Sequence, residues 1–327
     1  MRCDHHPTCP GCPLLSLDEG AQLEHKRGRL QAALDAYPHL NLGVAPPLQP
    51  AARSEGYRHR LKLPVHMGQN RISMGLIDSI SGRTLHTPDC PVLVPALREA
   101  IEPMLAALHG QRSLHSVDLR VSAETGALQL VLATHGGQLS GADALTATLL
   151  AEVPGLASVA VSTADPRKVR IMGHNPRVIA GESRIIDKIG DTELHIFPGA
   201  FFQTDPLTAA GLHAMVREAV GEAETVLDLY AGVGAYARML APGRQRVVAI
   251  EESVEAAEAA REGAPENMEV ICDRAEGQDL RALGPFDAAV INPARRGSRP
   301  EVLTALARSA QRLVYVSCGP ESLARDL

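Results

Sequence analysis

Beyond residue 201 the sequence alternates short apolar runs with helical segments, and this pattern constrains the fold more than any other feature. We predict strands at residues 225–230, 246–251, 268–272, 288–291 and 313–317. Regular alternation of strand and helix is typical of a parallel sheet. Ligands bind beyond the carboxyl ends of the strands in such sheets. The sequence therefore predicts an α/β fold with a Rossmann-like domain and a site at one edge of its sheet.

The first two of these strands end in residues suited to a nucleoside cofactor. Asp228-Leu-Tyr-Ala-Gly-Val-Gly234 closes the first strand, and its two glycines allow the backbone to pass close to a ligand. Glu251 closes the second strand, where an acid can bind ribose hydroxyls. No third glycine stands at the spacing of the NAD motif. The pattern favours S-adenosylmethionine over NAD.

The last two strands end in residues suited to a substrate. Asn292-Pro-Ala-Arg-Arg-Gly297 follows the fourth strand, and its amide can receive a planar base or the methionine end of the cofactor. Its arginines, together with Arg299, match phosphate. Cys318 follows the fifth strand, directly before a Gly-Pro break. A lone cysteine is more often buried and inert, but the neighbouring motifs favour a functional thiol here.

Four further cysteines form a set near the N-terminus. Cys3, Cys9 and Cys12 have the spacing C-x5-C-x2-C, and Cys90 follows in a turn-like Thr-Pro-Asp-Cys-Pro stretch. Four thiolates can hold either a tetrahedral zinc ion or a [4Fe–4S] cluster, and the spacing does not choose between them. Disulfides are a poorer interpretation, because disulfide-dense proteins are typically small and secreted.

Residues 57–65 are predicted to form a strand with a charged face. Arg58, Arg60 and Lys62 alternate with less polar residues, so a period of two places all three cations on one side. Such a face could follow a phosphate backbone. It could equally be a solvated edge strand protected by its charge. A helix at residues 18–37 and a proline-rich linker at residues 44–50 precede it.

The middle of the chain has an α+β pattern whose chemistry the sequence does not reveal. We predict helices at 96–108 and 142–150, and strands at 73–77, 116–122, 127–134, 158–162, 169–172 and 193–197. The expected organisation has three parts. Residues 1–90 hold the cysteines and the first strands of the middle domain, residues 91–200 form the α+β middle domain, and residues 201–327 form the Rossmann-like domain.

Composition bounds the class of protein and its partners. The chain has neither an apolar run of about 18 residues nor a signal-peptide core, so we expect a cytoplasmic protein without membrane association. The net charge is −6, and residues 201–327 contain 13 arginines and no lysine against 19 acidic residues. A nucleic-acid partner would therefore have to be bound by local basic patches.

Five motifs together resemble the RNA (uracil-5-)-methyltransferases, which use S-adenosylmethionine to make 5-methyluridine in rRNA and tRNA. The motifs are the four-cysteine set, Phe201-Phe-Gln-Thr-Asp205, Asp228-Leu-Tyr-Ala-Gly-Val-Gly234, Asn292-Pro-Ala-Arg295 and Ser317-Cys-Gly-Pro-Glu-Ser-Leu-Ala-Arg-Asp326. The resemblance runs from Cys3 to Leu327. It is greatest to the short 23S rRNA enzyme, which lacks an N-terminal β-barrel and also has Asn at the position of Asn292.

The resemblance implies a role for each motif. It implies a [4Fe–4S] cluster in the segment 1–90 on Cys3, Cys9, Cys12 and Cys90, and cofactor contacts from Gln203, Tyr230, Glu251 and Asn292. Cys318 becomes the nucleophile: a thiolate that adds to uracil C6 makes C5 reactive toward the methyl group. The target uridine must leave its stack to reach the thiol. The expected partner is RNA, foremost 23S rRNA, and the expected state is a monomer.

The chain departs from the family pattern at three places. Ala294 replaces the second proline of the usual Pro-Pro-Arg, and Gly319 replaces the asparagine that usually follows the nucleophile. The family also has a later Asp-x-Phe-Pro-x-Thr-x-His-x-Glu motif, whose Glu removes the C5 proton. The sequence stops at Leu327 without that motif and the two strands around it.

These departures leave alternatives open. One alternative is an RNA-binding iron–sulfur protein that is truncated or has lost catalysis. A small-molecule or protein methyltransferase with a zinc knuckle is a third interpretation. The Ser317-Cys318 pair disfavours it, because such enzymes do not need that thiol.

Overall fold

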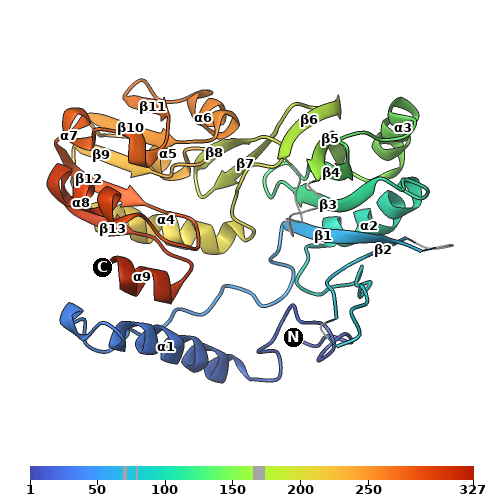
Figure 1. Ribbon diagram of the computed structural model, residues 1–327, viewed down its shortest axis with the longest axis horizontal. Coiled ribbons are helices and arrows are strands. Elements are labelled where there is room, and N and C mark those ends of the chain that lie inside the picture. Colours follow the sequence, from blue (N-terminus) through green and yellow to red (C-terminus); the bar gives the residue numbers. More distant parts are fainter. Residues whose placement is uncertain (69–71, 79, 165–173) are drawn as a thin grey trace. The chain divides into compact units, whose positions relative to one another are not determined.

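The computed structural model describes residues 1–68, 72–78, 80–164 and 174–327, and the chain forms two compact units (Figure 1). The first unit comprises Met1–Ser16, Ala52–Lys188 and His195–Pro206. The second unit comprises Leu17–Ala51, Ile189–Leu194 and Leu207–Leu327. Each unit therefore contains segments that are far apart in the sequence. The strand predicted at 169–172 lies outside the described residues.

The second unit contains the predicted parallel sheet. Residues 207–327 are all described, and their five strands have the order β11-β10-β9-β12-β13. The strands are β9 (Thr225–Leu229), β10 (Arg246–Glu251), β11 (Met268–Cys272), β12 (Phe286–Ile291) and β13 (Ala310–Tyr315). The helices between and around them are α4 (Pro206–Val220), α5 (Ala235–Leu240), α6 (Val254–Arg261), α7 (Leu280–Leu283), α8 (Pro300–Ser309) and α9 (Pro320–Asp326). The Rossmann-like prediction is confirmed for this unit.

Both faces of this sheet are buried, as expected when helices cover a parallel sheet on two sides. Along β10, Val247 and Ala249 pack into one apolar cluster with α4 and α5, while Val248 and Ile250 pack into a second cluster with α8. The chain builds outward from β9 through β10 to β11, and then from β12 to β13 on the other side. The strand order therefore reverses between β9 and β12, which is where open α/β sheets bind ligands.

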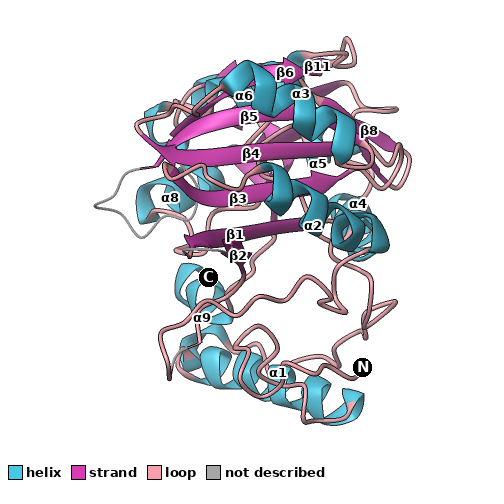
Figure 2. Cartoon of the chain, turned by 90° about the vertical axis from the view of Figure 1, so that its right-hand side faces the viewer, coloured by secondary structure: helices cyan, strands magenta, loops and turns pink. Residues whose placement is uncertain are grey.

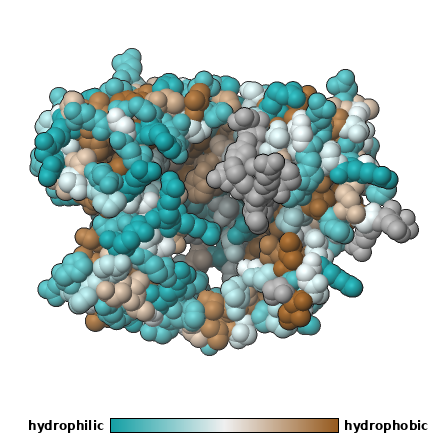
Figure 3. Space-filling model, in the orientation of Figure 1, coloured by the Kyte–Doolittle hydropathy of each residue, from teal (hydrophilic) through white to brown (hydrophobic). Residues whose placement is uncertain are grey.

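An N-terminal helix belongs to the second unit. Helix α1 (Glu19–Asp35) begins at Asp18, whose carboxylate accepts a hydrogen bond from the backbone N–H of Ala21 at 2.8 Å. It lies beside α9, and Arg29 donates two hydrogen bonds to Glu321, at 2.8 and 3.0 Å (Figure 1). Most of its side chains are exposed, and the space-filling view shows a largely hydrophilic surface there (Figure 3). No helix within the described residues is long and apolar enough to cross a membrane.

The first unit is built on a mixed sheet. Its described strands have the order β2-β1-β3-β4-β5-β6, and only β4 and β5 are parallel neighbours. Helix α3 joins these two strands, because a parallel pair requires a crossover. The elements are β1 (Arg60–Met67), β2 (Ile72–Met74), α2 (Pro95–Ala107), β3 (Leu114–Val121), β4 (Leu128–His135), α3 (Ala142–Glu152), β5 (Leu156–Ala164) and β6 (His174–Gly181). Figure 2 shows α2 and α3 lying across one face of this sheet.

Two strands of this region were not predicted from the sequence. They are β6 and β7 (Ile185–Ile189), and β7 pairs with β8 (Thr192–Ile196) in a two-stranded ribbon. The other predicted helices and strands that lie within described residues occur within a few residues of their expected bounds.

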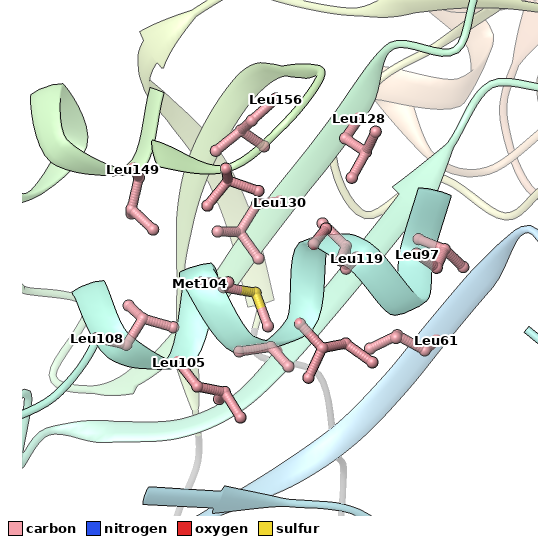
Figure 4. Packing of buried hydrophobic residues seen from close by; sticks show 14 of the residues in the cluster. Leu61, Leu97, Met104, Leu105, Leu108, Leu119, Leu128, Leu130, Leu149 and Leu156 are labelled. Carbon is pink, nitrogen blue, oxygen red and sulfur yellow. The ribbon is translucent and has the colours of Figure 1, made fainter. Parts of the chain in front are cut away.

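The core of the first unit lies between α2 and the sheet. Leu97, Met104 and Leu108 recur at helical spacing along one side of α2 and its C-terminal end, and each has no exposed surface. They face Leu119 and Leu130 on neighbouring strands (Figure 4). Burial of each such side chain contributes about 1.5 to 3 kcal/mol to stability.

The opposite face of this sheet contains buried charges. The strand predicted at residues 57–65 is present, but the open cationic face predicted for it is wrong. Arg60 is only 4% exposed, and its Nε and Nη2 donate to the two carboxylate oxygens of Asp118 at 2.8 and 2.5 Å. Strand β1 pairs with β3 over Arg60–Pro64 and with β2 over Val65–Met67. Arg58 precedes the strand, and the Lys62 side chain is 37% exposed. The three residues do not form an open cationic face.

The buried charges hold the segment that contains Gln203. Arg60 Nη1 and Arg120 Nη2 both donate to the carbonyl oxygen of Ala200, at 2.7 and 2.8 Å. The Arg120 guanidinium also lies 5.5 Å from the centre of the Phe202 ring. Burial alone would raise the pKa of Asp118, but the hydrogen bonds and charge of Arg60 lower it. Asp118 is therefore a buried anion that neutralises cations needed to fix this segment.

We expect Asp118→Ala to lower the free energy of unfolding by about 3 to 5 kcal/mol, because it leaves buried guanidinium groups without their counter-charge. Urea titration measures the change. Glu124→Ala is the matched control, since it removes an exposed pair with Lys188 in the same unit and should cost at most about 1 kcal/mol. Equal losses in the two variants would show that the Asp118 network does not stabilise the first unit.

Candidate active site

Four predicted site residues lie at one edge of the five-stranded sheet. Tyr230 follows β9, Glu251 ends β10, Asn292 follows β12 and Cys318 lies just beyond β13. Parallel strands bring their carboxyl ends to the same edge, so the second unit gathers these residues. Gln203 belongs to the first unit, and its contact with a cofactor stays a prediction.

The turn after β9 is held in a conformation that favours glycine. Tyr230, Gly232 and Gly234 have φ angles of +65°, +57° and +79°. A side chain at such an angle costs about 1 to 3 kcal/mol, which surrounding structure must offset. A Cβ atom at Gly234 would lie 3.0 Å from Ala260 Cβ, so the close packing of this turn requires a glycine. The backbone is thereby folded back over the strand edge.

Glu251 fixes the shape of this turn. Its Oε2 accepts a hydrogen bond from the Gly232 N–H and its Oε1 accepts one from the Ser253 N–H, both at 2.8 Å. Each carboxylate oxygen has a further acceptor position. The carboxylate can therefore hold the glycine turn and still receive the ribose hydroxyls of a nucleoside. The glycine turn and this acid fit S-adenosylmethionine.

Asp228 is a buried acid beneath the same turn. No role of its own was predicted for this residue from the sequence. It has no exposed surface, and its Oδ2 accepts a hydrogen bond from the Ala237 N–H at 2.9 Å. Its Oδ1 has no hydrogen-bond partner among the described residues. Burial raises the pKa of Asp228 to about 7, and the charge of Glu251 adds to the effect. An acid at the end of a strand, shortly before the glycines, was the sequence feature that could have identified it.

Asn292 lies at the point where the strand order reverses. Its backbone N–H donates to the carbonyl oxygen of Leu229 at 3.4 Å, which joins the ends of β12 and β9. Arg295 and Arg296 are exposed in the loop that follows. Arg299 is also exposed and forms an ion pair with Glu276, with Nε and Oε1 3.3 Å apart. Arg295 and Arg296 are thus available to an anionic ligand beside the strand edge.

Cys318 is exposed in a short turn between β13 and α9. The turn is closed on both sides of the thiol. The Gly319 N–H donates to Ser317 Oγ at 3.1 Å, and the Ser322 hydroxyl donates to the Gly319 carbonyl oxygen at 3.0 Å. Cys318 is therefore not the buried, inert cysteine that the sequence left as an alternative.

The four N-terminal cysteines all belong to the first unit and are half-buried free thiols. Burial raises the pKa of Cys12, and the charges of the nearby Cys90, Cys9 and Cys3 raise it further. Among the residues the structure describes, however, no group of His, Cys, Asp or Glu side chains has the arrangement of a metal site. The donor set is of the type that binds zinc or an iron–sulfur cluster, although its ligating geometry is not formed.

Known proteins resemble the chain over nearly its whole length. No family model matches it. The uncharacterized RNA methyltransferase gll3134 of Gloeobacter violaceus is 32% identical over 349 residues, which cover 99% of this chain and 75% of the relative. The uncharacterized RNA methyltransferase OB0768 of Oceanobacillus iheyensis is 27% identical over 345 residues, which cover 98% of this chain and 75% of that relative.

A solved structure shares the fold of both units. The tRNA (uracil-54, C5)-methyltransferase of Pyrococcus abyssi, in complex with S-adenosyl-L-homocysteine, has a TM-score of 0.78 and 25% identity. The match covers 97% of this chain and 77% of that one. The α/β part is thus a methyltransferase fold with an additional sheet domain before it. With these relatives, this chain belongs to the RNA methyltransferase family, in the group that includes the RNA (uracil-5-)-methyltransferases.

Proposed function

We propose that the protein methylates uridine at C5 in RNA, with S-adenosylmethionine as methyl donor and Cys318 as nucleophile. The observation that carries the proposal is the exposed Cys318 thiol at the sheet edge that also holds Tyr230, Glu251 and Asn292. A thiol and a nucleoside-binding turn at one edge suit methyl transfer to a base that is first activated covalently. A catalytically inactive RNA-binding protein would have no need of an exposed thiol at this edge.

In this mechanism the side chains of the second unit bind the cofactor and activate the target uridine. Glu251 and the glycine turn hold the cofactor, which supplies the methyl group. The Cys318 thiolate attacks C6 of a uridine that has left its stack, and the C5–C6 double bond opens to an enolate that is nucleophilic at C5. C5 takes the methyl group. Removal of the C5 proton by a base then restores the C5–C6 double bond and breaks the bond between Cys318 Sγ and C6; none of the site residues named above is assigned to this proton transfer.

The substrate we propose is 23S rRNA. Asn292 stands in the motif by which the chain resembles the short 23S rRNA enzyme. Arg295 and Arg296 are exposed beside it, and their guanidinium groups can pair with RNA phosphates. The likeness to the Pyrococcus tRNA enzyme makes tRNA the second candidate. An assay that contains both a 23S rRNA fragment and a tRNA transcript shows which of the two RNAs is methylated.

We also propose that Cys3, Cys9, Cys12 and Cys90 hold a [4Fe–4S] cluster. The nearness of Cys90, Cys9 and Cys3 to Cys12 in the first unit supports this assignment. Cys90 is far from the other three in the sequence, so a cluster would tie the N-terminal segment to the loop before α2. Its contribution would be to the folding of this region, because ligands brought together by a metal site are rarely preformed in the unfolded chain.

Cys318→Ala should lower the rate of 5-methyluridine formation at least about 1000-fold, because the attack at C6 has no other nucleophile. Formation is measured by nucleoside analysis after incubation with S-adenosylmethionine and either a 23S rRNA fragment or a tRNA transcript. Cys272→Ala is the control and should stay within a few-fold of the wild type. Normal methylation by Cys318→Ala would refute the covalent mechanism.

Glu251→Ala should weaken S-adenosylmethionine binding by about 1 to 3 kcal/mol, or roughly 5- to 150-fold, because a half-buried acceptor for backbone N–H groups and, in the proposed complex, ribose hydroxyls is lost. Calorimetric titration gives the dissociation constant. The neighbouring Glu252→Ala removes only an exposed pair with Arg274 and should bind as the wild type does. Equal affinity in all three proteins would mean that the cofactor site is assigned wrongly.

Protein purified without oxygen should contain iron and sulfide and absorb broadly near about 400 nm, as expected for a cluster held by four thiolates. Cys90→Ser should lose the absorption and much of the iron, whereas Cys272→Ala should retain both. A colourless protein that contains one tightly bound zinc ion would exclude the cluster and leave the zinc interpretation.

A further inference from the structure

A single carboxylate connects the parts of the candidate active site. Asp326 is the last residue of α9, the helix that begins two residues after Cys318. Its side chain is only 3% exposed. Its Oδ2 accepts hydrogen bonds from the Tyr315 hydroxyl at 2.6 Å and from the Ser298 backbone N–H at 2.7 Å. One oxygen atom thus joins β13, α9 and the loop after β12.

The connection continues to the proposed cofactor site. The Ser298 hydroxyl and the Tyr230 hydroxyl form a hydrogen bond of 2.9 Å. Ser298 is buried and Tyr230 is half-buried, so the bond is partly buried. The series from Tyr230 through Ser298 to Asp326 therefore extends from the turn after β9 to the helix that follows Cys318. All of these residues belong to the second unit.

The loop after β12 is shaped to meet this carboxylate. Gly297 has a φ of +79°, and a Cβ atom at that position would overlap Asp326 Oδ2 and the Arg325 guanidinium. Arg325 Nη2 donates to the Arg296 carbonyl oxygen at 2.7 Å, which is a second bond between α9 and the same loop. The glycine and the two bonds indicate a close fit of backbone against α9.

Asp326 is held in its charged form. Burial alone would raise the pKa of Asp326, but hydrogen bonds from Tyr315, Ser298 and Arg325 lower it below the usual value. Arg325 donates to Oδ1 through Nε at 2.9 Å. Both oxygens are therefore engaged. Hydrogen bonds to an ionised acceptor are about twice as strong as those between neutral groups, which makes this connection rigid.

We infer that Asp326 is a positioning residue that fixes the Cys318 turn relative to the Tyr230 turn, so that the nucleophile and the cofactor site behave as one body. The inference rests on the proposed function for its effect on methyl transfer. Methyl transfer needs the sulfur, the base and the methyl group in a fixed arrangement, and a misplacement of about 1 Å can cost about 100-fold in rate. Asp326 acts through its contacts with Tyr315 and Ser298.

Asp326→Asn tests the inference, because it keeps the side-chain shape but removes the charge. We expect the single-turnover rate of methyl transfer, at saturating S-adenosylmethionine and RNA, to fall about 10- to 100-fold. Ser298→Ala is the second variant, since it removes only the link to Tyr230 and keeps the backbone bond to Asp326. Glu321→Gln is the control: it alters an exposed residue of the same helix that pairs with Arg29.

A thermodynamic cycle separates positioning from a general loss of structure. Tyr230→Phe and Asp326→Asn are measured singly and together for binding of S-adenosylhomocysteine by calorimetry. Coupled residues give a double variant that binds about as weakly as the weaker single variant. Additive effects, or a wild-type transfer rate in Asp326→Asn, would overturn the inference. If the wild type itself forms no 5-methyluridine, the proposed function fails, and the binding cycle still tests the link between the two turns.

Discussion

Burial of both faces of the five-stranded parallel sheet is the constraint on which the candidate site depends. Alternate residues of β10 enter opposite apolar clusters, so a shift by one residue would move each set to the other face and force both close-packed clusters to repack. The registers of β9, β10 and β12 are fixed in this way. Their carboxyl ends then meet at one edge, and the short turns that follow must carry the chemistry. Tyr230, Glu251, Asn292 and Cys318 stand at or just beyond these strand ends.

Those strand ends could be predicted from the sequence because they depend on local patterns. Short apolar runs that are closed by Gly, Asn, Pro or Cys give both the strand and its end, and their alternation with helices predicts that the strands are parallel. The glycine motif and Glu251 were recognisable for the same reason. The hydrogen bonds that the Gly232 and Ser253 N–H groups donate to Glu251 were not recognisable, because spacing along the chain does not reveal which backbone groups lack a partner.

Contacts between distant segments could not be predicted in this way. A period of two showed that Arg60 and Lys62 share a face of β1, but not that Asp118 and the Ala200 carbonyl cover that face. The pairing of Arg29 with Glu321 joins residues 292 positions apart and places α1 with the second unit. Strand β6 was missed because residues 174–181, with Asn, Pro and Gly, lack a clear alternation. For both arginines, the residue that forms the contact is distant in the sequence, and no motif or periodicity links the two segments.

The covalent role of Cys318 is the central claim, and it can be observed directly with RNA that contains 5-fluorouridine. Fluorine at C5 cannot leave as a proton does, so the bond between sulfur and C6 persists after methyl transfer. The protein is incubated with this RNA and S-adenosylmethionine, digested, and examined by mass spectrometry. The account predicts a methylated fluorouridine nucleotide on the peptide that contains Cys318. An adduct on another residue, or methylation of ordinary uridine RNA with no adduct on the fluorinated RNA, would contradict it.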